Sequence, residues 1–199
     1  MTLKANGLTM LHLGLGSFHR AHQAVYLQNL IAAGDDTWAI AGGNLRPDMA
    51  DTVAALQRQG GEYTLETVTP GGVRSYERIT SIRRVIPYEP SLAELISLGA
   101  AADTRIISFT VTEAGYYLDA KNNLDMNFAD LAGDLVKANR GEPGQTIYGA
   151  LTSILRARMA AKGGKVTLLN CDNLRHGGDR FRGGLLQFID LIRDPDLLA

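Results

Sequence analysis

Hydrophobic and polar positions follow two different periods along this chain, and the change from one to the other predicts strands separated by helices. Short apolar runs of strand length are each followed by a turn or loop and then by apolar residues at helical spacing. The expected strands are 8–13, 38–41, 105–111 and 165–170, and the expected helices are 18–33, 49–59, 91–101, 147–161 and 181–192. This order favours a mostly parallel sheet covered by helices on both faces.

The middle of the chain has a different pattern. Residues 63–68 alternate in polarity and end at the turn 69–72, whose sequence is Thr-Pro-Gly-Gly. Residues 73–76 are the expected hairpin partner, and 79–86 form a further extended segment. We therefore expect an α/β, doubly wound, mostly parallel sheet with a β-rich insertion.

Composition excludes several classes of function. The chain has 199 residues, a net charge of −1 and 45% hydrophobic residues, so we expect neither a nucleic acid nor a membrane as partner. Cys171 is the only cysteine, which excludes an internal disulfide and favours a reducing compartment. The N-terminus lacks the apolar core of a signal peptide, and no apolar run reaches the ~20 residues of a membrane helix. We expect a soluble cytoplasmic protein.

A glycine-rich turn follows the first expected strand. Gly14 provides the backbone freedom of a tight strand-to-helix turn, and Gly16 allows the main chain to approach a pyrophosphate. The helix that follows presents free N–H groups, and Ser17 adds a hydroxyl donor. A Gly-x-Gly turn alone is weak evidence, because it can be simply a tight turn. Its place in the first βαβ unit favours nucleotide binding. We therefore expect the sheet to be Rossmann-like and residues 1–199 to form one dinucleotide-binding domain.

His19 stands where the usual third glycine of this pattern would be. His19 and His22 are three residues apart and would share one face of the expected helix. Only His12 and His176 remain as further histidines, so we expect no metal site. Two interpretations stay open: these histidines pack and hydrogen-bond at the start of the helix, or they line the phosphates of a cofactor or the substrate side of the cleft.

The second expected strand lacks the acid that usually binds a ribose. An Asp or Glu about 20 residues after the glycines would favour NAD, and an arginine would accommodate the 2′-phosphate of NADP. This chain has Asn44 and Arg46 there, with acids only earlier or later, at Asp35, Asp36 and Asp48. Asn44 is the candidate ribose partner, and the choice between NAD and NADP stays open.

Two later loops follow expected strands and therefore belong at the same edge of the sheet. Thr110, Thr112 and Glu113 come after the strand 105–111 and are candidate cofactor contacts. Asn173 follows the strand 165–170, and its amide donor is suited to stabilise an alkoxide as a carbinol loses hydride.

The residues next to Asn173 have simpler interpretations. Cys171 is expected to be a packed, unreactive thiol, and Asp172 to cap the following helix.

Three motifs in this order resemble the mannitol dehydrogenase family of polyol-specific long-chain dehydrogenases. The first is Gly-Leu-Gly-Ser-Phe-His-Arg-Ala-His at 14–22, in which histidine replaces the third glycine. The second is Thr-Glu-Ala-Gly-Tyr-Tyr at 112–117. The third is Cys-Asp-Asn-Leu-Arg-His-Gly-Gly at 171–178, where Gly177 departs from the more common asparagine. The resemblance runs from about residue 8 to the end of the chain.

The resemblance implies a metal-independent oxidation of a sugar alcohol, arabinitol or mannitol, to a ketose with NAD, NADP not being excluded. It also implies that the general base is a lysine of a Lys-x4-Asn-x2-His motif in a second, helical domain. This chain contains no such motif, so we expect that domain to be a missing part of the same polypeptide. Asn173 matches the asparagine of the oxyanion site. The residues expected to bind the cofactor are Gly14, Gly16, Ser17, Phe18, His19, Asn44, Arg46, Thr110, Thr112, Glu113 and Asn173.

Other functions compete with this interpretation. A hexuronate or a sugar-alcohol phosphate would be an anionic substrate, for which Arg20 and Arg175 are candidate partners unless they hold cofactor phosphates. A non-catalytic nucleotide-binding module would share the same glycine turn. A methyltransferase also uses a glycine-rich first turn and is the most distant alternative.

Overall fold

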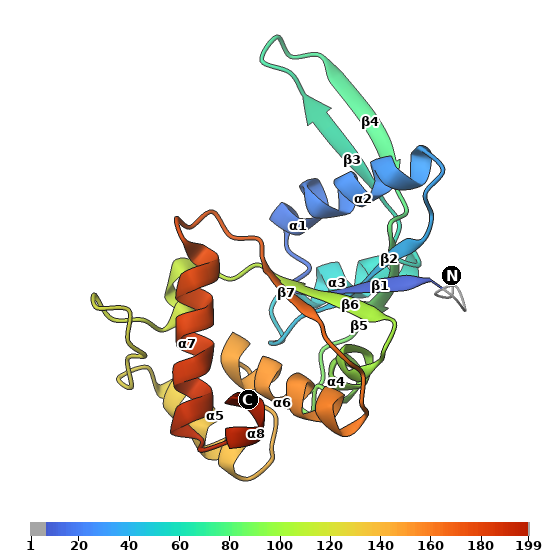
Figure 1. Ribbon diagram of the computed structural model, residues 1–199. Helices are drawn as coiled ribbons and strands as arrows, with labels where there is room; N and C mark the ends of the chain where they lie inside the picture. The colour runs from blue at the N-terminus through green and yellow to red at the C-terminus, as the bar shows by residue number, and fades with distance from the viewer. Residues whose placement is uncertain (1–6, 199) are drawn as a thin grey trace.

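The computed structural model describes residues 7–198, and its centre is a five-stranded parallel sheet (Figure 1). The strand order is β5-β2-β1-β6-β7, and each neighbouring pair is parallel. The strands are β1 (Leu8–Leu13), β2 (Trp38–Gly43), β5 (Ile82–Ile86), β6 (Thr104–Phe109) and β7 (Thr167–Asn170). The winding reverses between β1 and β6, which confirms the doubly wound, Rossmann-like class.

Helices cover both faces of the sheet, each over its own hydrophobic cluster. Ile40 and Ala41 are neighbours on β2, and they belong to different clusters because successive strand residues point to opposite faces. The cluster of Ile40 includes residues of α2 and α3, and the larger cluster of Ala41 includes residues of α4, α6 and α7. The helices are α1 (Ser17–Ala21), α2 (Gln23–Ala32), α3 (Ala50–Arg58), α4 (Ala93–Ala100), α5 (Ala129–Asn139), α6 (Ile147–Ala160), α7 (Gly177–Leu191) and α8 (Pro195–Leu198).

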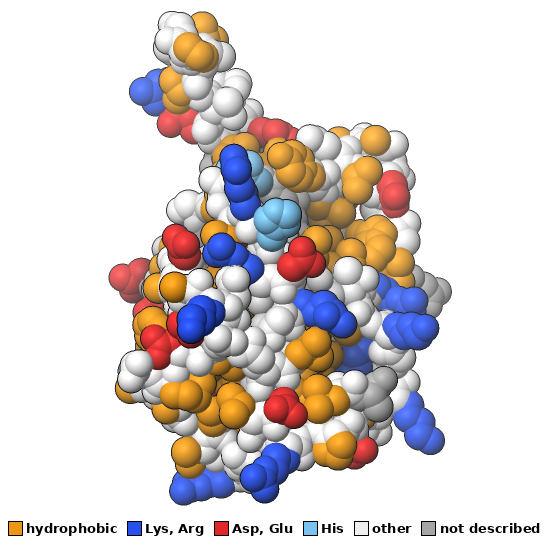
Figure 2. Space-filling model, turned by 60° about the vertical axis from the view of Figure 1, so that its left-hand side comes forward, with side chains coloured by type: hydrophobic (Ala, Val, Ile, Leu, Met, Phe, Trp, Pro, Cys, Tyr) orange, Lys and Arg blue, Asp and Glu red, His pale blue; other side chains and the backbone are white. Residues whose placement is uncertain are grey.

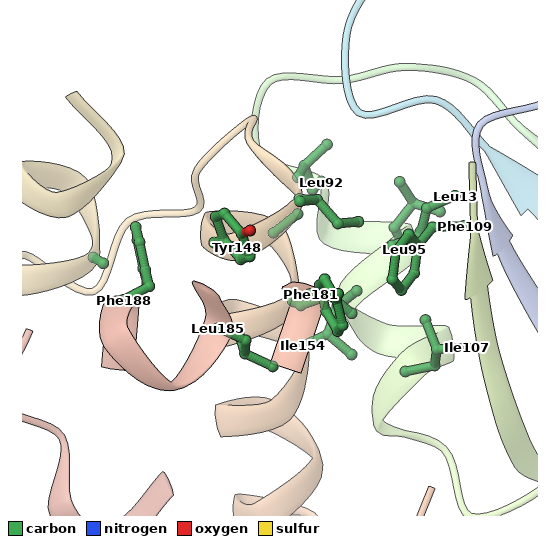
Figure 3. Close-up of a cluster of buried hydrophobic side chains, with 14 of the residues drawn as sticks. Leu13, Leu92, Leu95, Ile107, Phe109, Tyr148, Ile154, Phe181, Leu185 and Phe188 are labelled. Carbon is green, nitrogen blue, oxygen red and sulfur yellow. The ribbon is translucent and has the colours of Figure 1, made fainter. Parts of the chain in front are cut away.

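Aromatic side chains join the larger cluster to the sheet (Figure 3). The ring of Phe109 on β6 lies 4.5 Å from that of Phe181 on α7, and Tyr148 of α6 stacks on Phe181 at 5.9 Å. The buried Tyr148 hydroxyl donates to the carbonyl of Tyr116 at 2.9 Å, so its polar end is satisfied. Strand β6, the loop after it and two helices are therefore fixed to one another next to the carboxyl edge of the sheet.

The β-rich insertion is a hairpin that projects from the body of the protein (Figures 1 and 2). It consists of β3 (Tyr63–Val68) and β4 (Arg74–Ile79), which pair antiparallel. The expectation that 79–86 belongs to this insertion is wrong for β5, which pairs parallel with β2 in the main sheet. The chain leaves the hairpin at Ser81, whose buried hydroxyl donates to the carbonyl of Ala24 at 2.6 Å and anchors the crossing to α2.

The helix expected over 18–33 is broken into α1 and α2 at His22. His22 Nδ1 donates to the carbonyl of Phe18 at 2.9 Å, and this is the carbonyl that the His22 backbone N–H would use in an α-helix. The backbone N–H bonds His19 O instead, which tightens the turn. His19 and His22 therefore do not lie on one face of a continuous helix.

The polar stretch after β6 contains two elements that the sequence pattern did not indicate. They are a 3₁₀ helix, η1 (Glu113–Tyr116), and the helix α5. Leu131, Asp134 and Ala138 form the buried face of α5, so a carboxylate occupies a position where periodicity requires an apolar side chain. Asp134 accepts a hydrogen bond from the backbone N–H of Thr146 at 2.6 Å and thereby ties α5 to the start of α6.

Within residues 7–198, every helix is too short or too polar to cross a membrane.

Candidate dinucleotide site

A cleft of about 580 Å³ opens where β1, β2 and β6 end. This is the edge at which doubly wound sheets bind ligands, next to the point where the winding reverses. Six predicted cofactor residues line it together: Gly14, Gly16, Asn44, Arg46, Thr110 and Thr112. The opposite wall comes from α5 and the start of α6 and includes Phe128, Asp130, Gln145, Thr146 and Ile147.

Gly14 and Gly16 are glycines for different reasons. Gly14 has a φ of +113°, and an added Cβ would lie 3.2 Å from the carbonyl oxygen of Thr110, so the turn itself requires glycine. Gly16 has φ −71° and ψ 173°, which any residue adopts, and an added Cβ would meet no atom of the described residues within 4 Å. Gly16 lines the cleft, and no atom of the described residues fills the space beside it, as the approach of a pyrophosphate requires.

Asn44 lines the cleft, but its amide is engaged by the protein. The side-chain oxygen accepts from the backbone N–H of Leu15 at 2.8 Å, and the amide nitrogen donates to the carbonyl of Asp48 at 2.8 Å. Asn44 is 8% exposed, so these bonds lie in a mostly dry environment. Its clearest role is therefore to hold the glycine turn against the loop after β2. The sequence indicated its place but not this contact.

Arg46 bridges the loop after β2 and the helical wall. Its Nη2 donates to the Tyr117 hydroxyl at 2.7 Å and to Asp130 Oδ2 at 2.7 Å. Asp48 also lines the cleft. Burial lowers the pKa of the Arg46 guanidinium, but the Tyr117 hydroxyl and the Asp130 and Asp48 carboxylates raise it by more, so it lies above its ordinary value. Arg46 thus remains a cation that faces two carboxylates.

A buried polar cluster lies behind the glycine turn. The rings of His12 on β1 and His19 on α1 stack with centroids 3.6 Å apart. His12 Nδ1 bonds Ser108 Oγ at 2.8 Å, and His19 Nδ1 donates to Gln23 Oε1 at 2.9 Å, because a carbonyl oxygen only accepts. Ser108 also donates to Gln23 Oε1 at 3.2 Å. The cluster joins β1, β6, α1 and α2.

This cluster confirms that His19 packs at the start of the helix and leaves its contact with the cofactor a prediction. His19 is 1% exposed, and its Nε2 has no hydrogen-bond partner among residues 7–198. Burial lowers the pKa of His19 to about 4, although the bond to Gln23 acts in the opposite direction. Burial, followed by the effect of His19, also lowers the pKa of His12 well below its usual value. Both imidazoles are neutral at pH 7.

We expect the stability of the domain to fall as the pH decreases from about 6.5 toward 4. Between the ordinary histidine pKa of 6.5 and the folded value of about 4, the unfolded chain binds a proton that buried His19 does not. This contribution is fully present above pH 6.5, and about 3 kcal/mol is lost across the window. Urea unfolding at a series of pH values gives the slope. His19→Gln should reduce it, and an unchanged slope would contradict the account.

Asp172 connects the two loops that follow β6 and β7. Its Oδ1 accepts from the backbone N–H of Val111 at 2.7 Å, and its Oδ2 accepts from the Tyr116 hydroxyl at 2.5 Å. Asn170 completes the network through bonds to Tyr116 and Asp172. Burial raises the pKa of Asp172. The expectation that Asp172 caps α7 is wrong, because His176 is the N-cap and the carboxylate is engaged with the β6 loop.

Asn173 follows Asp172 directly and is exposed at the surface of the β7 loop. The described residues that line the cleft do not include it, so Asn173 lies outside the cleft lining. The neighbouring Cys171 is half-buried, and burial raises the pKa of its thiol, which fits an unreactive group.

Three other predicted residues lie outside the cleft lining of the described chain. Ser17 begins α1 and accepts from Arg20 Nη2 at 3.5 Å. Phe18 is half-exposed and stacks on His22 with ring centroids 4.3 Å apart. Glu113 begins η1 and is exposed. These residues flank the loops that form the cleft.

The two arginines considered for an anionic substrate also lie away from the cleft. The Arg20 guanidinium is 6.0 Å from the centre of the Tyr63 ring at the base of the hairpin. Arg175 is exposed in the loop before α7. Over residues 7–198, no group of three or more His, Cys, Asp and Glu is placed to hold a metal ion.

The sheet order and the position of the cleft define a Rossmann-type domain. Comparison with known families identifies it further: residues 8–198 match the mannitol dehydrogenase Rossmann domain. The chain belongs to the mannitol dehydrogenase family.

Several relatives and a solved structure are similar to this chain. It is 53% identical over 186 residues to D-arabinitol 4-dehydrogenase of Klebsiella pneumoniae, covering 94% of this chain and 40% of that protein. It is 37% identical over 183 residues to mannitol 2-dehydrogenase of Cereibacter sphaeroides, covering 92% and 38%. The Pseudomonas fluorescens mannitol 2-dehydrogenase ternary complex with NAD and D-mannitol superposes with a TM-score of 0.86 at 32% identity, covering 99% and 40%. The chain thus spans about two fifths of the length of these relatives.

Proposed function

We propose that this chain is the part of a polyol dehydrogenase that binds the nicotinamide dinucleotide. The observation that carries the proposal is the open side of Gly16, which lies in a cleft at the reversal point of a doubly wound sheet. The named relatives support oxidation of a sugar alcohol to a ketose. We propose D-arabinitol ahead of mannitol as the substrate, because this chain is 53% identical to the arabinitol dehydrogenase and 37% identical to the mannitol dehydrogenase.

The residues present fit such a cofactor. The first turn of α1 leaves backbone N–H groups for a diphosphate, whereas those of Gly14, Leu15 and Gly16 bond to the protein. The loop after β2 lies where a ribose belongs. We propose NAD over NADP, because Asp48 and Asp130 make the surroundings of Arg46 unfavourable for a further phosphate. When bound, the nicotinamide supplies the hydride acceptor for the substrate carbinol.

Asn173 is the residue of this chain that we propose to act on the substrate. Its exposed amide donates to the oxygen that becomes an alkoxide as the hydroxyl proton leaves. Asp172 positions it through the bonds to Val111 and Tyr116. The general base is a lysine of a second, helical domain, so the present chain contributes cofactor binding and one electrophilic group. A substrate that is a hexuronate is less favoured, since Arg20 packs on the hairpin.

A thermal unfolding series distinguishes this proposal from its rivals. A ligand present at a hundred times its Kd stabilises the native state by about 2.7 kcal/mol, which corresponds to a rise in Tm of roughly 5–10 °C for a domain of this size. We expect that rise with NADH and no rise with S-adenosylmethionine. The opposite pattern would indicate a methyltransferase, and no rise with either compound would contradict nucleotide binding.

A further inference from the structure

Arg46 and Asp130 meet at the cleft from segments that are far apart in the sequence. Arg46 lies three residues after β2, and Asp130 lies in the first turn of α5, the helix that the sequence pattern did not indicate. Their side chains form an ion pair at 2.7 Å, and the same Nη2 donates to the Tyr117 hydroxyl. Both partners line the cleft, together with the carboxylate of Asp48.

Arg46 lies at the position after the second strand that contacts the ribose of a bound dinucleotide in related folds. In doubly wound sheets, the residues after the second strand face the ribose of the bound dinucleotide. An acid there accepts from the 2′-hydroxyl, and an arginine there accommodates a 2′-phosphate. Arg46 occupies the place of a phosphate-binding arginine, but its guanidinium is already directed to Asp130 and Tyr117.

We propose that Asp130 is a specificity-determining residue that makes this cleft select a dinucleotide with a free 2′-hydroxyl. It acts by holding Arg46 away from the ribose and by adding a second negative charge to that of Asp48. This inference rests on the proposed function, since it concerns the choice between two forms of the same cofactor.

The charges around Arg46 explain how a half-exposed ion pair determines which form of the cofactor binds. Exposed ion pairs contribute little to folding, so the role of this pair does not depend on its own strength. A 2′-phosphate brings between one and two further negative charges to a place where one guanidinium already faces two carboxylates. Binding it requires Arg46 to leave Asp130, and the abandoned carboxylate then repels the phosphate.

Asp130→Asn tests the proposal, because it removes the charge and keeps the size of the side chain. We expect the ratio of the Kd of NADPH to the Kd of NADH to fall roughly tenfold. Asp190→Asn is the matched control, since it makes the same change on an exposed residue of α7, and it should leave the ratio unchanged. The ratio is measured by fluorescence titration of both reduced cofactors.

A double-mutant cycle separates an effect through Arg46 from a general loss of negative charge. In an Arg46→Gln background, Asp130→Asn should lower the ratio by a smaller factor than in the wild type, because only the repulsion by the carboxylate remains and the arginine that the substitution releases is gone. An Asp130→Asn ratio equal to that of the wild type, or an equal fall in both backgrounds, would overturn the assignment. If the wild type binds neither cofactor, the proposed function fails instead, so the two failures are distinguishable.

Discussion

Arg158→Ala is expected to lower the free energy of unfolding by about 4 kcal/mol, a large effect for one residue far from the cleft. Arg158 lies on α6 and is 3% exposed. All five of its N–H groups donate to backbone carbonyls, which belong to Gly99, Ala101, Gly163, Gly164 and Lys165. The guanidinium thus joins the end of α4, the end of α6 and the segment that leads to β7. Alanine leaves these carbonyls without their donor and creates a cavity.

Urea unfolding monitored by circular dichroism measures this loss. Arg158→Lys should recover little, because an ammonium group has three donors at one point and cannot reach carbonyls on three segments. The exposed Arg140→Ala is the control, with an expected change below about 0.5 kcal/mol. A loss below about 1 kcal/mol for Arg158→Ala would show that the buried guanidinium does not organise this part of the fold.

Gly16→Val is expected to weaken the binding of NADH on the order of a hundredfold while the protein stays folded. The backbone angles of Gly16 suit valine, and residues 7–198 leave its Cβ position open, so we expect the branched side chain to fit at the cleft that Gly16 lines without displacing the protein. There it occupies the space in which a pyrophosphate would approach the main chain. Gly16 is the N-cap of α1, and replacing a favourable N-cap residue lowers the stability by only about 1 kcal/mol, so the variant should remain folded.

The control for this result is valine at a second glycine whose Cβ position is unobstructed. Gly71→Val lies in the turn of the projecting hairpin, where the nearest atom to an added Cβ is 3.9 Å away. It should bind NADH with the affinity of the wild type. Equal affinity of Gly16→Val and wild type, with both folded by circular dichroism, would exclude the glycine turn from the binding site.

Much of the fold was predictable because the sheet strands are short apolar runs. Leu11, Leu13, Ile107 and Phe109 are almost fully buried, as residues in a sheet covered on both faces must be. The order of strands and helices then leaves few topologies, and the glycine turn after β1 marks the edge that carries the cleft. Six of the predicted cofactor residues line that cleft for this reason.

The remaining features depend on contacts between residues that are distant in sequence. Asn44 accepts from Leu15, 29 residues away, and Asp172 accepts from Val111, 61 residues away, so local pattern indicated neither bond. A buried carboxylate, Asp134, concealed the apolar face of α5, and the side chain of His22 broke a helix whose periodicity looked continuous. The Arg46–Asp130 pair also joins two segments that are distant in sequence, so the local pattern did not predict it.

Titration of the wild-type chain with NADH tests the central claim most directly, because the claim is that this cleft binds a nicotinamide dinucleotide. We expect the cofactor fluorescence to change and to saturate with one site per chain, and the change to be lost in Gly16→Val but kept in Gly71→Val. No change up to millimolar NADH, with the chain folded, would contradict the account.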